Sequence, residues 1–569
     1  MKIFVVFPSF IKFIFVVPIL VGIFGVLLPS FGYFPEIGGN KLSLDVFGQL
    51  IREPTLPNSI LLTIFSGISS TLISLILAIF LSAIISSGDI LWTQKRILAN
   101  FILAINKGLI SLIAIPHAAI ALGFAFLISP SGWIIRWISF GFSDWDTPPE
   151  LETLQDSMGI SLILGLLLKE TPYLLLMILI SLPQIKYKQY IYIGQSLGYG
   201  LFDCWLKLIL PQIYPLIRLP VFAVLVFSLS VVDVALILGP TTPPTLSILI
   251  MQWMENPDIN FRFVASAGAV LLFLISFFSI VTWRFLEWVF LENHNNWQIN
   301  GKRRSGKILQ IFTILCGVIV VVICFLNVLC LLFWSFSNRW AYPNVLPSIW
   351  TLSNWARYWN SLQETILITL EVGLISTTIA LFLAIGYLEN ENYIKKKVKM
   401  HSFWWIYLPL LVPQATFLLG IQILSISLHL DGTMIFLIWS HLLFVLPYIF
   451  LSFSDSWRSL DHRMLTTAQC LGSSPLRNLF RIKLPVLFKP LLVTMAIGLS
   501  VSIAQYLPTL FAGGGRFSTL TTEAVSLASS GDMRVIGVFA FLQSILPLIG
   551  ILLAFLIPKL FYRHRSEMT

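Results

Sequence analysis

Long apolar stretches recur along the whole chain, and they constrain its fold more than any other feature. A stretch of about 20 apolar residues is long enough for a helix to cross the roughly 30 Å hydrocarbon core of a bilayer. With 57% hydrophobic and 11% charged residues, the chain is too apolar to stay soluble on its own. We therefore predict an all-α polytopic membrane protein. Its twelve predicted spans are 13–32, 60–86, 99–129, 159–182, 214–238, 263–283, 309–335, 366–387, 403–427, 434–453, 489–511 and 535–558.

Basic loops predict how these spans are oriented. Lysine and arginine collect in short loops after even-numbered spans, and such loops are retained on the cytoplasmic side. Both termini are therefore predicted to be cytoplasmic. The acidic loop 144–156 falls on the opposite face. The net charge of +10 thus reflects topology and attraction to anionic lipid, and it requires no nucleic-acid partner.

The chain is predicted to be an internal duplication, because several small residues and prolines recur in the same order in its two halves. The matched pairs include Thr63 and Thr369, Gly67 and Gly373, Pro116 and Pro413, Gly123 and Gly420, and Pro172 and Pro447. Since each half holds an even number of spans, both halves point the same way and form parallel repeats. Small residues in these spans are expected to make helix contacts more often than substrate contacts.

One polar segment that interrupts the apolar stretches occurs twice in the chain. Residues 195–211 read QSLGYGLFDCWLKLILP, and residues 469–485 read QCLGSSPLRNLFRIKLP. Each lies between the fourth and fifth spans of its half, on the predicted cytoplasmic side. A glycine permits a sharp change of direction, and the proline thirteen residues later is expected to end a short surface helix. Two equal helices on one face indicate a docking pair for a two-fold symmetric partner.

These residues resemble the cytoplasmic loop of permease subunits in binding-protein-dependent ABC importers. In that family the loop has the sequence motif EAA, then three residues, a glycine, nine residues, and I-x-L-P. The second copy fits fully from Gly472 onwards, and the first fits from Gly198 with leucine in place of isoleucine. The EAA part differs, reading YIG at 192–194 and TTA at 466–468, so the family's acidic contact to its ATPase is absent. The residues to which the resemblance assigns ATPase coupling are Gly198, Leu208, Leu210, Pro211, Gly472, Ile482, Leu484 and Pro485.

The resemblance covers nearly the whole chain as two fused permease domains, the arrangement of ferric-iron-type and thiamine-type importers. It implies the type I ABC importer permease fold in a bacterial cytoplasmic (inner) membrane. The implied parts are a first domain, 1–293, with coupling loop 185–212; a basic cytoplasmic linker, 294–308; and a second domain, 309–569, with coupling loop 457–488. A dimeric ATPase would receive the two loops, and an extracytoplasmic solute-binding protein would deliver a small solute.

No catalytic site is predicted within the chain. Residues 301–308, GKRRSGKI, nearly match the phosphate-binding motif GxxxxGK[ST]. Ile308, however, replaces the magnesium-binding hydroxyl, and a membrane span follows where a soluble βα unit is required. We therefore expect a transport subunit that binds no cofactor or metal itself, with ATP and magnesium used by the partner ATPase.

Ionisable residues inside spans are costly in lipid, so each is weighed as a functional candidate. Lys169 and Glu170 are expected to be structural, with partners on neighbouring spans. Asp233, in the fifth span, is the better pathway candidate, and Gln505 stands in the corresponding region of the second half. In the family resembled, the fifth span helps to line the route. An acid and an amide there could meet a cation or a polar organic solute.

Two other functions stay open at this stage. A secondary, ion-coupled transporter also carries repeats, but it favours broken helices around a midplane site, and coupling carboxylates. A polytopic membrane enzyme or scaffold leaves the repeated loop unexplained. The substrate is not specified by the sequence, since iron(III), thiamine and other small polar solutes are all compatible with it.

Overall fold

The computed structural model of the chain describes residues 3–91, 96–143, 145–299, 301, 306–394, 405–529 and 531–562. Within these ranges, ten helices are long and apolar enough to cross a membrane, and two further pairs of helices pass the same test as bent spans. These twelve segments follow the twelve predicted spans in order, which confirms the prediction of an all-α polytopic protein.

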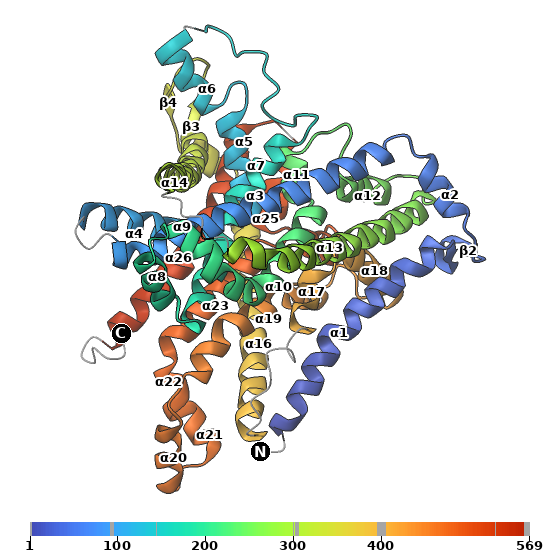
Figure 1. Cartoon of the computed structure of the whole chain (residues 1–569). Coiled ribbons are helices and arrows are strands. Elements are labelled where there is room, and N and C mark those ends of the chain that lie inside the picture. Colours follow the sequence, from blue (N-terminus) through green and yellow to red (C-terminus); the bar gives the residue numbers. More distant parts are fainter. Residues whose placement is uncertain are drawn as a thin grey trace.

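The first half runs from α1 to α13 (Figure 1). Its elements are α1 (Ile3–Ser30), β1 (Tyr33–Phe34), η1 (Pro35–Ile37), β2 (Gly39–Asn40), α2 (Asp45–Arg52), α3 (Leu56–Leu91), α4 (Arg96–Ser111), η2 (Leu112–Ala114), α5 (His117–Ile128), α6 (Trp133–Ile138), η3 (Ser139–Ser143), α7 (Ile160–Ser181), η4 (Leu182–Gln184), α8 (Tyr187–Ser196), α9 (Leu201–Cys204), η5 (Trp205–Ile209), α10 (Leu210–Ser230), α11 (Asp233–Leu238), α12 (Leu246–Met254) and α13 (Phe261–Ile299).

The second half repeats this order from α14 to α26. Its elements are α14 (Lys307–Phe336), β3 (Ser337–Arg339), β4 (Ile349–Trp350), α15 (Ser353–Arg357), α16 (Trp359–Ile394), α17 (Leu408–Leu411), α18 (Gln414–Ser427), α19 (Met434–Arg458), α20 (His462–Cys470), α21 (Pro475–Asn478), η7 (Leu479–Lys483), α22 (Leu484–Val486), α23 (Phe488–Ile503), α24 (Leu507–Gly513), α25 (Leu520–Ala528) and α26 (Met533–Phe561). In both halves a short antiparallel hairpin, β1 with β2 or β3 with β4, follows the first long helix.

Matching threonines show that the two halves are built alike. The backbone N–H of Leu246 donates to Thr63 Oγ1 over 2.8 Å, and that of Leu520 donates to Thr369 Oγ1 over 3.0 Å. Each threonine thus satisfies the first N–H of a short helix, α12 or α25, which has no carbonyl partner within its own helix. The same hydrogen bond at matched positions confirms the predicted repeat.

The matched glycines also serve helix packing, as predicted. A Cβ on Gly67 of α3 would lie 2.6 Å from the side chain of Leu229 on α10, and one on Gly373 of α16 would lie 2.7 Å from Leu499 on α23. Helices can approach this closely in lipid only where one side chain is absent. These two residues therefore make contacts between helices.

The first long helix of each half packs against the other half. Gly123 of α5 packs against Asn327 of α14, while Gly420 of α18 packs against Gly22 of α1. The first helix of each half therefore lies against the other half, and the buried apolar core contains residues of both. This packing joins the two repeats into one helix bundle.

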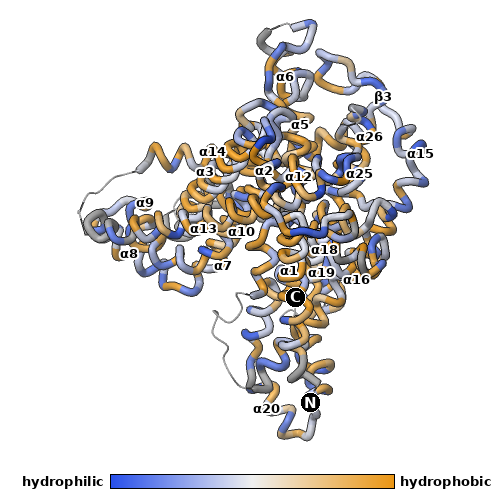
Figure 2. Tube along the Cα trace, turned by 90° about the vertical axis from the view of Figure 1, so that its right-hand side faces the viewer, coloured by the Kyte–Doolittle hydropathy of each residue, from blue (hydrophilic) through white to orange (hydrophobic). Residues whose placement is uncertain are grey.

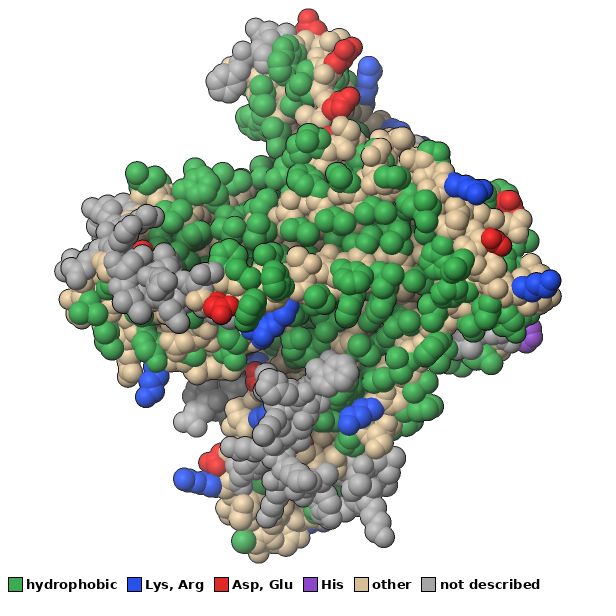
Figure 3. Space-filling model, turned by 45° about the vertical axis from the view of Figure 1, so that its right-hand side comes forward, with side chains coloured by type: hydrophobic (Ala, Val, Ile, Leu, Met, Phe, Trp, Pro, Cys, Tyr) green, Lys and Arg blue, Asp and Glu red, His purple; other side chains and the backbone are tan. Residues whose placement is uncertain are grey.

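Apolar side chains form a broad band across the face of the bundle that Figure 3 shows, as expected for a surface that faces lipid. Polar segments gather beyond the ends of the long helices (Figure 2). In Figure 1 the first repeated loop, α8–α9, lies at the left and the second, α20–α22, at the bottom, so both lie in the lower left half of the view with the start of α1 and the end of α26. The hairpin strands β3 and β4 lie at the top of the same view, and β2 lies at the right.

The third and ninth spans, predicted as continuous helices, are broken. Residues 99–129 form α4, η2 and then α5, with Pro116 directly before the first residue of α5. In the second half, the helices on either side of Pro413 bend by 97°. A proline disfavours the helical conformation of the residue before it, so both breaks occur where the sequence places the matched prolines.

The predicted basic linker, 294–308, is occupied at its edges by the ends of two long helices. α13 continues to Ile299, and α14 begins at Lys307. Residues 300 and 302–305, which include most of the basic charge of the linker, lie outside the described residues, as do the basic residues 395–399.

Candidate functional site

A cavity of about 330 Å³ lies between the two halves. Its walls come from α5, α7, α10 and α11 of the first half and from α19, α23 and α26 of the second. Since both halves contribute comparable elements, the cavity lies where a pathway between two parallel repeats is expected.

The fifth span of each half is broken beside this cavity. α10 ends at Ser230, and α11 begins at Asp233 after two non-helical residues. α23 ends at Ile503, and Gln505 lies in the interval before α24. Asp233 and Gln505 both line the cavity, and each is only 8% exposed. The structure thus brings the two predicted pathway residues to one site, at a break that the sequence analysis missed.

Lys169 and Glu170 find the neighbouring partners that were predicted for them. Glu170 Oε1 lies 3.1 Å from His117 Nε2, so α7 is linked to α5. Lys169 Nζ donates to the carbonyls of Ile113 and Ile115 over 2.6 and 2.5 Å. The break before Pro116 leaves carbonyls without a helical partner, and the ammonium group satisfies them.

The second half holds a buried histidine that is also satisfied locally. His441 Nδ1 lies 2.8 Å from Ser502 Oγ, and Nε2 lies 2.9 Å from Thr509 Oγ1. His441 therefore links α19 to α23 and α24. Within the described part of the chain, no group of three or more histidine, cysteine or acidic residues could hold a metal ion.

Asp233 differs from the buried carboxylates of Glu170 and Glu287, because no basic side chain among the described residues lies within ion-pair distance of it. Most of the cavity wall is aliphatic, and it also contains Lys169 and several aromatic side chains, including Tyr448 and Tyr506. Aromatic faces attract cations, and an unpaired carboxylate adds to this attraction. The cavity therefore has the chemistry to receive a positively charged group.

The two repeated loops share one backbone geometry. Gly198 and Gly472 have φ angles of +81° and +80°. Residues other than glycine rarely adopt this left-handed backbone conformation. Each glycine follows a short helix, α8 or α20, and precedes another that passes into a π-helical turn, η5 or η7. These turns begin at Trp205 and Leu479, which are 274 positions apart. The same interval separates Gly198 from Gly472.

The prediction that the prolines end the short helices is wrong for Pro211, whereas the helix that contains Pro485 ends one residue later, at Val486. The first helix continues from Leu201 to Ser230 without a gap, and in the second half the bend of 78° comes after Pro485, between Val486 and Phe488. A proline removes one backbone donor and its ring crowds the preceding turn. In the first half, the wider π-helical turn that ends at Ile209 accommodates this defect, so the helix continues past Pro211.

The other predicted coupling residues, Leu208, Leu210, Ile482 and Leu484, are half-buried, so each touches the bundle with part of its side chain. The residues before the glycines, Leu197 and Leu471, are 55% and 83% exposed. At the third position of the EAA pattern the first loop has a local reason for its departure, since a Cβ on Gly194 would clash with Cys204 Sγ. α8 can therefore pack closely against α9.

Comparison with known proteins shows to which protein family the chain belongs. Over 529 residues the chain is 31% identical to the inner membrane ABC transporter permease protein YnjC of Escherichia coli (strain K12), and the match covers 91% of each chain. The chain belongs to the ABC transporter permease family. No family model matches it.

Two other relatives match part of this ABC permease. Over 241 residues it is 24% identical to the putative 2-aminoethylphosphonate transport system permease protein PhnV of Salmonella typhimurium (strain LT2), which covers 42% of this chain and 87% of the relative. Over 165 residues it is 26% identical to the spermidine/putrescine transport system permease protein PotC homolog of Mycoplasma genitalium, which covers 29% of this chain and 58% of the relative. The protein is a permease subunit of an ABC importer. Broken helices, which the sequence analysis associated with a secondary transporter, thus occur in an ABC permease.

Proposed function

We propose that this permease is a fused double-domain subunit of the inner membrane, with domain 1–293 joined to domain 309–569 by the basic linker 294–308. The lengths of the matches support this division, because nearly all of PhnV corresponds to less than half of this chain. The repeated Thr63 and Thr369 contacts support it as well.

The two repeated loops receive a separate ATPase dimer, which binds ATP and magnesium. The support is their equal backbone geometry and their position in the same half of the view in Figure 1. The exposed Leu197 and Leu471 offer one apolar contact on each loop. On this proposal both termini are cytoplasmic, because the start of α1 and the end of α26 lie in that half of the view as well. The chain then works as a transport subunit without an ATPase site of its own.

The central cavity is the part of the pathway that a small cationic solute crosses after a binding protein delivers it. One observation carries this proposal: Asp233 and Gln505 stand at equivalent helix breaks and line the same cavity. Asp233 supplies a carboxylate without a basic partner among the described residues, and Gln505 supplies an amide.

The aromatic part of the lining favours an organic cation such as an amine over a bare metal ion, because rings bind cations by their faces and do not coordinate metals. Thiamine fits this class directly, and iron(III) fits it only in a complexed form. The relatives named for 2-aminoethylphosphonate and for spermidine and putrescine support the proposal, because each of those solutes contains an amine.

Affinity purification of the tagged chain in mild detergent, with mass spectrometry and ATPase assays of the eluate, tests the partner assignment. The expected result is one ATPase at two copies per chain, lost when both loops are altered. Recovery of the chain alone, under conditions in which other ABC complexes survive, would contradict it.

Uptake into proteoliposomes of the complete complex tests the cargo assignment. Thiamine, putrescine and ferric citrate serve as probes, and the variants are Asp233→Asn and, as a control at the protein surface, Asp532→Asn. We expect Asp233→Asn to reduce uptake of an amine probe at least tenfold and the control to leave it unchanged. Equal uptake by Asp233→Asn and the unaltered chain would refute a cation site at Asp233.

A further inference from the structure

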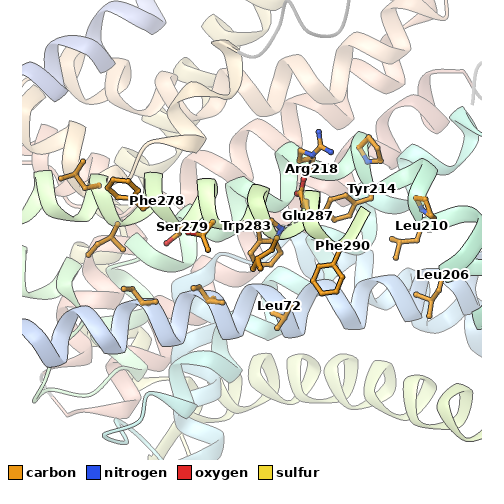
Figure 4. Close-up of a pocket in the computed structure, with 18 of the residues that line it drawn as sticks. Leu72, Leu206, Leu210, Tyr214, Arg218, Phe278, Ser279, Trp283, Glu287 and Phe290 are labelled. Carbon is orange, nitrogen blue, oxygen red and sulfur yellow. Dashed lines mark hydrogen bonds and ion pairs between the residues drawn. The ribbon is translucent and has the colours of Figure 1, made fainter. Parts of the chain in front are cut away.

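A second hollow lies on the outer face of the first half, away from the central cavity. It is a groove of about 830 Å³ between α3, α10 and α13 (Figure 4). Most of its wall is apolar, and Ile68, Leu72, Leu274 and Phe278 are exposed along it. All three helices include segments long and apolar enough to span the membrane, so the groove opens toward lipid.

A charged cluster closes one side of this groove. Glu287 Oε2 lies 3.0 Å from Arg218 Nε and 2.7 Å from Arg284 Nη1, and Tyr214 Oη donates to Glu287 Oε1 over 2.7 Å. Trp283 Nε1 in turn donates to Tyr214 Oη over 2.9 Å. Figure 4 shows Arg218, Glu287, Tyr214 and Trp283 next to one another along the groove.

The charged cluster contains two arginines and one glutamate, so one of its positive charges is not neutralised within the cluster. The single carboxylate of Glu287 is buried, whereas the side chains of Arg218 and Arg284 are 25% and 51% exposed. The contact of Arg218 Nε with Glu287 is an ion pair without hydrogen-bond geometry, and none of the described residues forms a hydrogen bond with the terminal nitrogens of Arg218. An arginine fork with free N–H groups matches the geometry of a phosphate group.

On α13, the charged cluster lies toward the end at which a lipid head group is expected. Trp283 and Glu287 lie near the end of the α13 segment that can span the membrane, Phe261–Phe290. Leu206, Leu210 and Pro211, which follow the first repeated loop, line the same groove. Tryptophan and tyrosine gather at membrane interfaces, and basic pockets between helices on the cytoplasmic side bind anionic head groups.

The second half does not build the same groove. Phe488 stands 274 positions after Tyr214, and its ring packs against Phe561 and Tyr562 with centroid distances of 5.9 Å to each. Leu492 takes the place of Arg218. The second half thus sets its own aromatic side chains at this position and has no arginine there. Because the arginine is present in the first half and replaced by Leu492 in the second, the charged groove is a feature of the first half.

We propose that this groove binds one anionic phospholipid of the cytoplasmic leaflet. An acyl chain lies along Leu72, Leu274 and Phe278, and the phosphate group binds Arg218 and Arg284. Since Leu206 and Leu210 form part of the wall, the bound lipid packs against the helix that follows the first repeated loop. The volume of the groove is within the range of about 300–1,000 Å³ usual for ligand sites.

Native mass spectrometry of the full chain in detergent tests this proposal. Phosphatidylglycerol and phosphatidylcholine with identical acyl chains are the probes, because they differ in net charge but have the same tails. We expect the unaltered chain to retain phosphatidylglycerol about fivefold to tenfold more strongly, as one unneutralised arginine near a head group allows.

Two variants from opposite walls locate the site. Arg218→Gln is expected to remove the preference for phosphatidylglycerol, and Leu72→Trp, which fills the groove, to reduce retention of both lipids. Arg458→Gln is the matched control, because Arg458 also pairs with a glutamate, Glu391, at a helix end in the second half. Equal retention of the two lipids by the unaltered chain overturns the proposal. So does a preference that persists unchanged in both Arg218→Gln and Leu72→Trp.

Discussion

The two repeated loops have the same backbone but are held to the bundle by different forces. In the first loop Phe202 is buried, and its ring packs against Phe80 of α3 with centroids 5.1 Å apart. Its counterpart 274 positions later, Leu476, is 55% exposed. The second loop projects from the lower end of the bundle in Figure 1.

An ion pair replaces apolar packing in the second loop. Ile209 of the first loop is fully buried, and its counterpart Lys483 pairs with Glu389 at the end of α16. Glycine and proline spacing thus sets the backbone of both loops, and the side chains around it set how firmly each loop is attached. The predictions below test this difference.

Truncation of the matched pair Phe202 and Leu476 should give the largest contrast. Phe202→Ala removes a buried ring and is expected to cost about 3–5 kcal/mol of stability, whereas Leu476→Ala should stay within about 0.5 kcal/mol. Thermal unfolding of the purified chain in detergent, followed by circular dichroism, measures both. Equal shifts in Tm would mean that the two loops are attached alike.

Removal of one ion-pair partner should have the next largest effect. Glu389→Gln leaves the ammonium group of Lys483 without its carboxylate in a largely buried place, which is expected to cost about 1–3 kcal/mol. Replacing both residues by methionine should recover much of this loss, because no unpaired charge then remains. The same unfolding assay applies, and a double variant less stable than Glu389→Gln would contradict the interpretation.

Substitution of the loop glycines tests whether both loops couple to the ATPase. Gly472→Val places a β-branched residue at a φ of +80° at a cost of about 1–2 kcal/mol, although a Cβ there would meet no neighbour. We expect severalfold lower uptake with continued ATP hydrolysis and an unchanged amount of protein in the membrane.

Gly472→Asn is the matched control for this experiment, because asparagine tolerates the left-handed region better. Gly198→Val should act like Gly472→Val if the shared backbone is what the ATPase recognises. Unchanged uptake in both valine variants would remove the coupling role from the loops.

The smallest expected effect concerns the first turn of α26. Hydrogen bonds from the Arg534 guanidinium hold the pKa of Asp532 below its usual range. A lowered pKa in the folded state means that this stabilisation is present above the unfolded value of about 3.9 and is lost as the pH falls through the folded value.

Because both side chains are partly exposed, Asp532→Asn should cost no more than about 1 kcal/mol at pH 7 and almost nothing near pH 2. Tm measurements across this pH range check the prediction. Asp258→Asn, before α13, is the matched control, since none of the described residues forms an ion pair with Asp258. An equal pH dependence in the two variants would contradict the role of Arg534.

The sequence predicted the spans and the repeat well, because both depend on local composition and spacing. It placed Asp233 and Gln505 in corresponding regions, but it missed the helix breaks beside them. A break after Ser230 has no proline or glycine to mark it, unlike the breaks at Pro116 and Pro413. At this break Val231 adopts an extended conformation.

The sequence by itself determined the number of spans, the two-fold repeat and the turn at each loop glycine. These features follow from apolar length and from the conformational limits of glycine and proline, which act within a few residues. Only the tertiary structure decided that Asp233 and Gln505 line one cavity, that His117 pairs with Glu170, and that Arg218 borders a groove. Each of these depends on helices far apart in the chain coming together, and spacing along one helix does not determine which neighbour it meets.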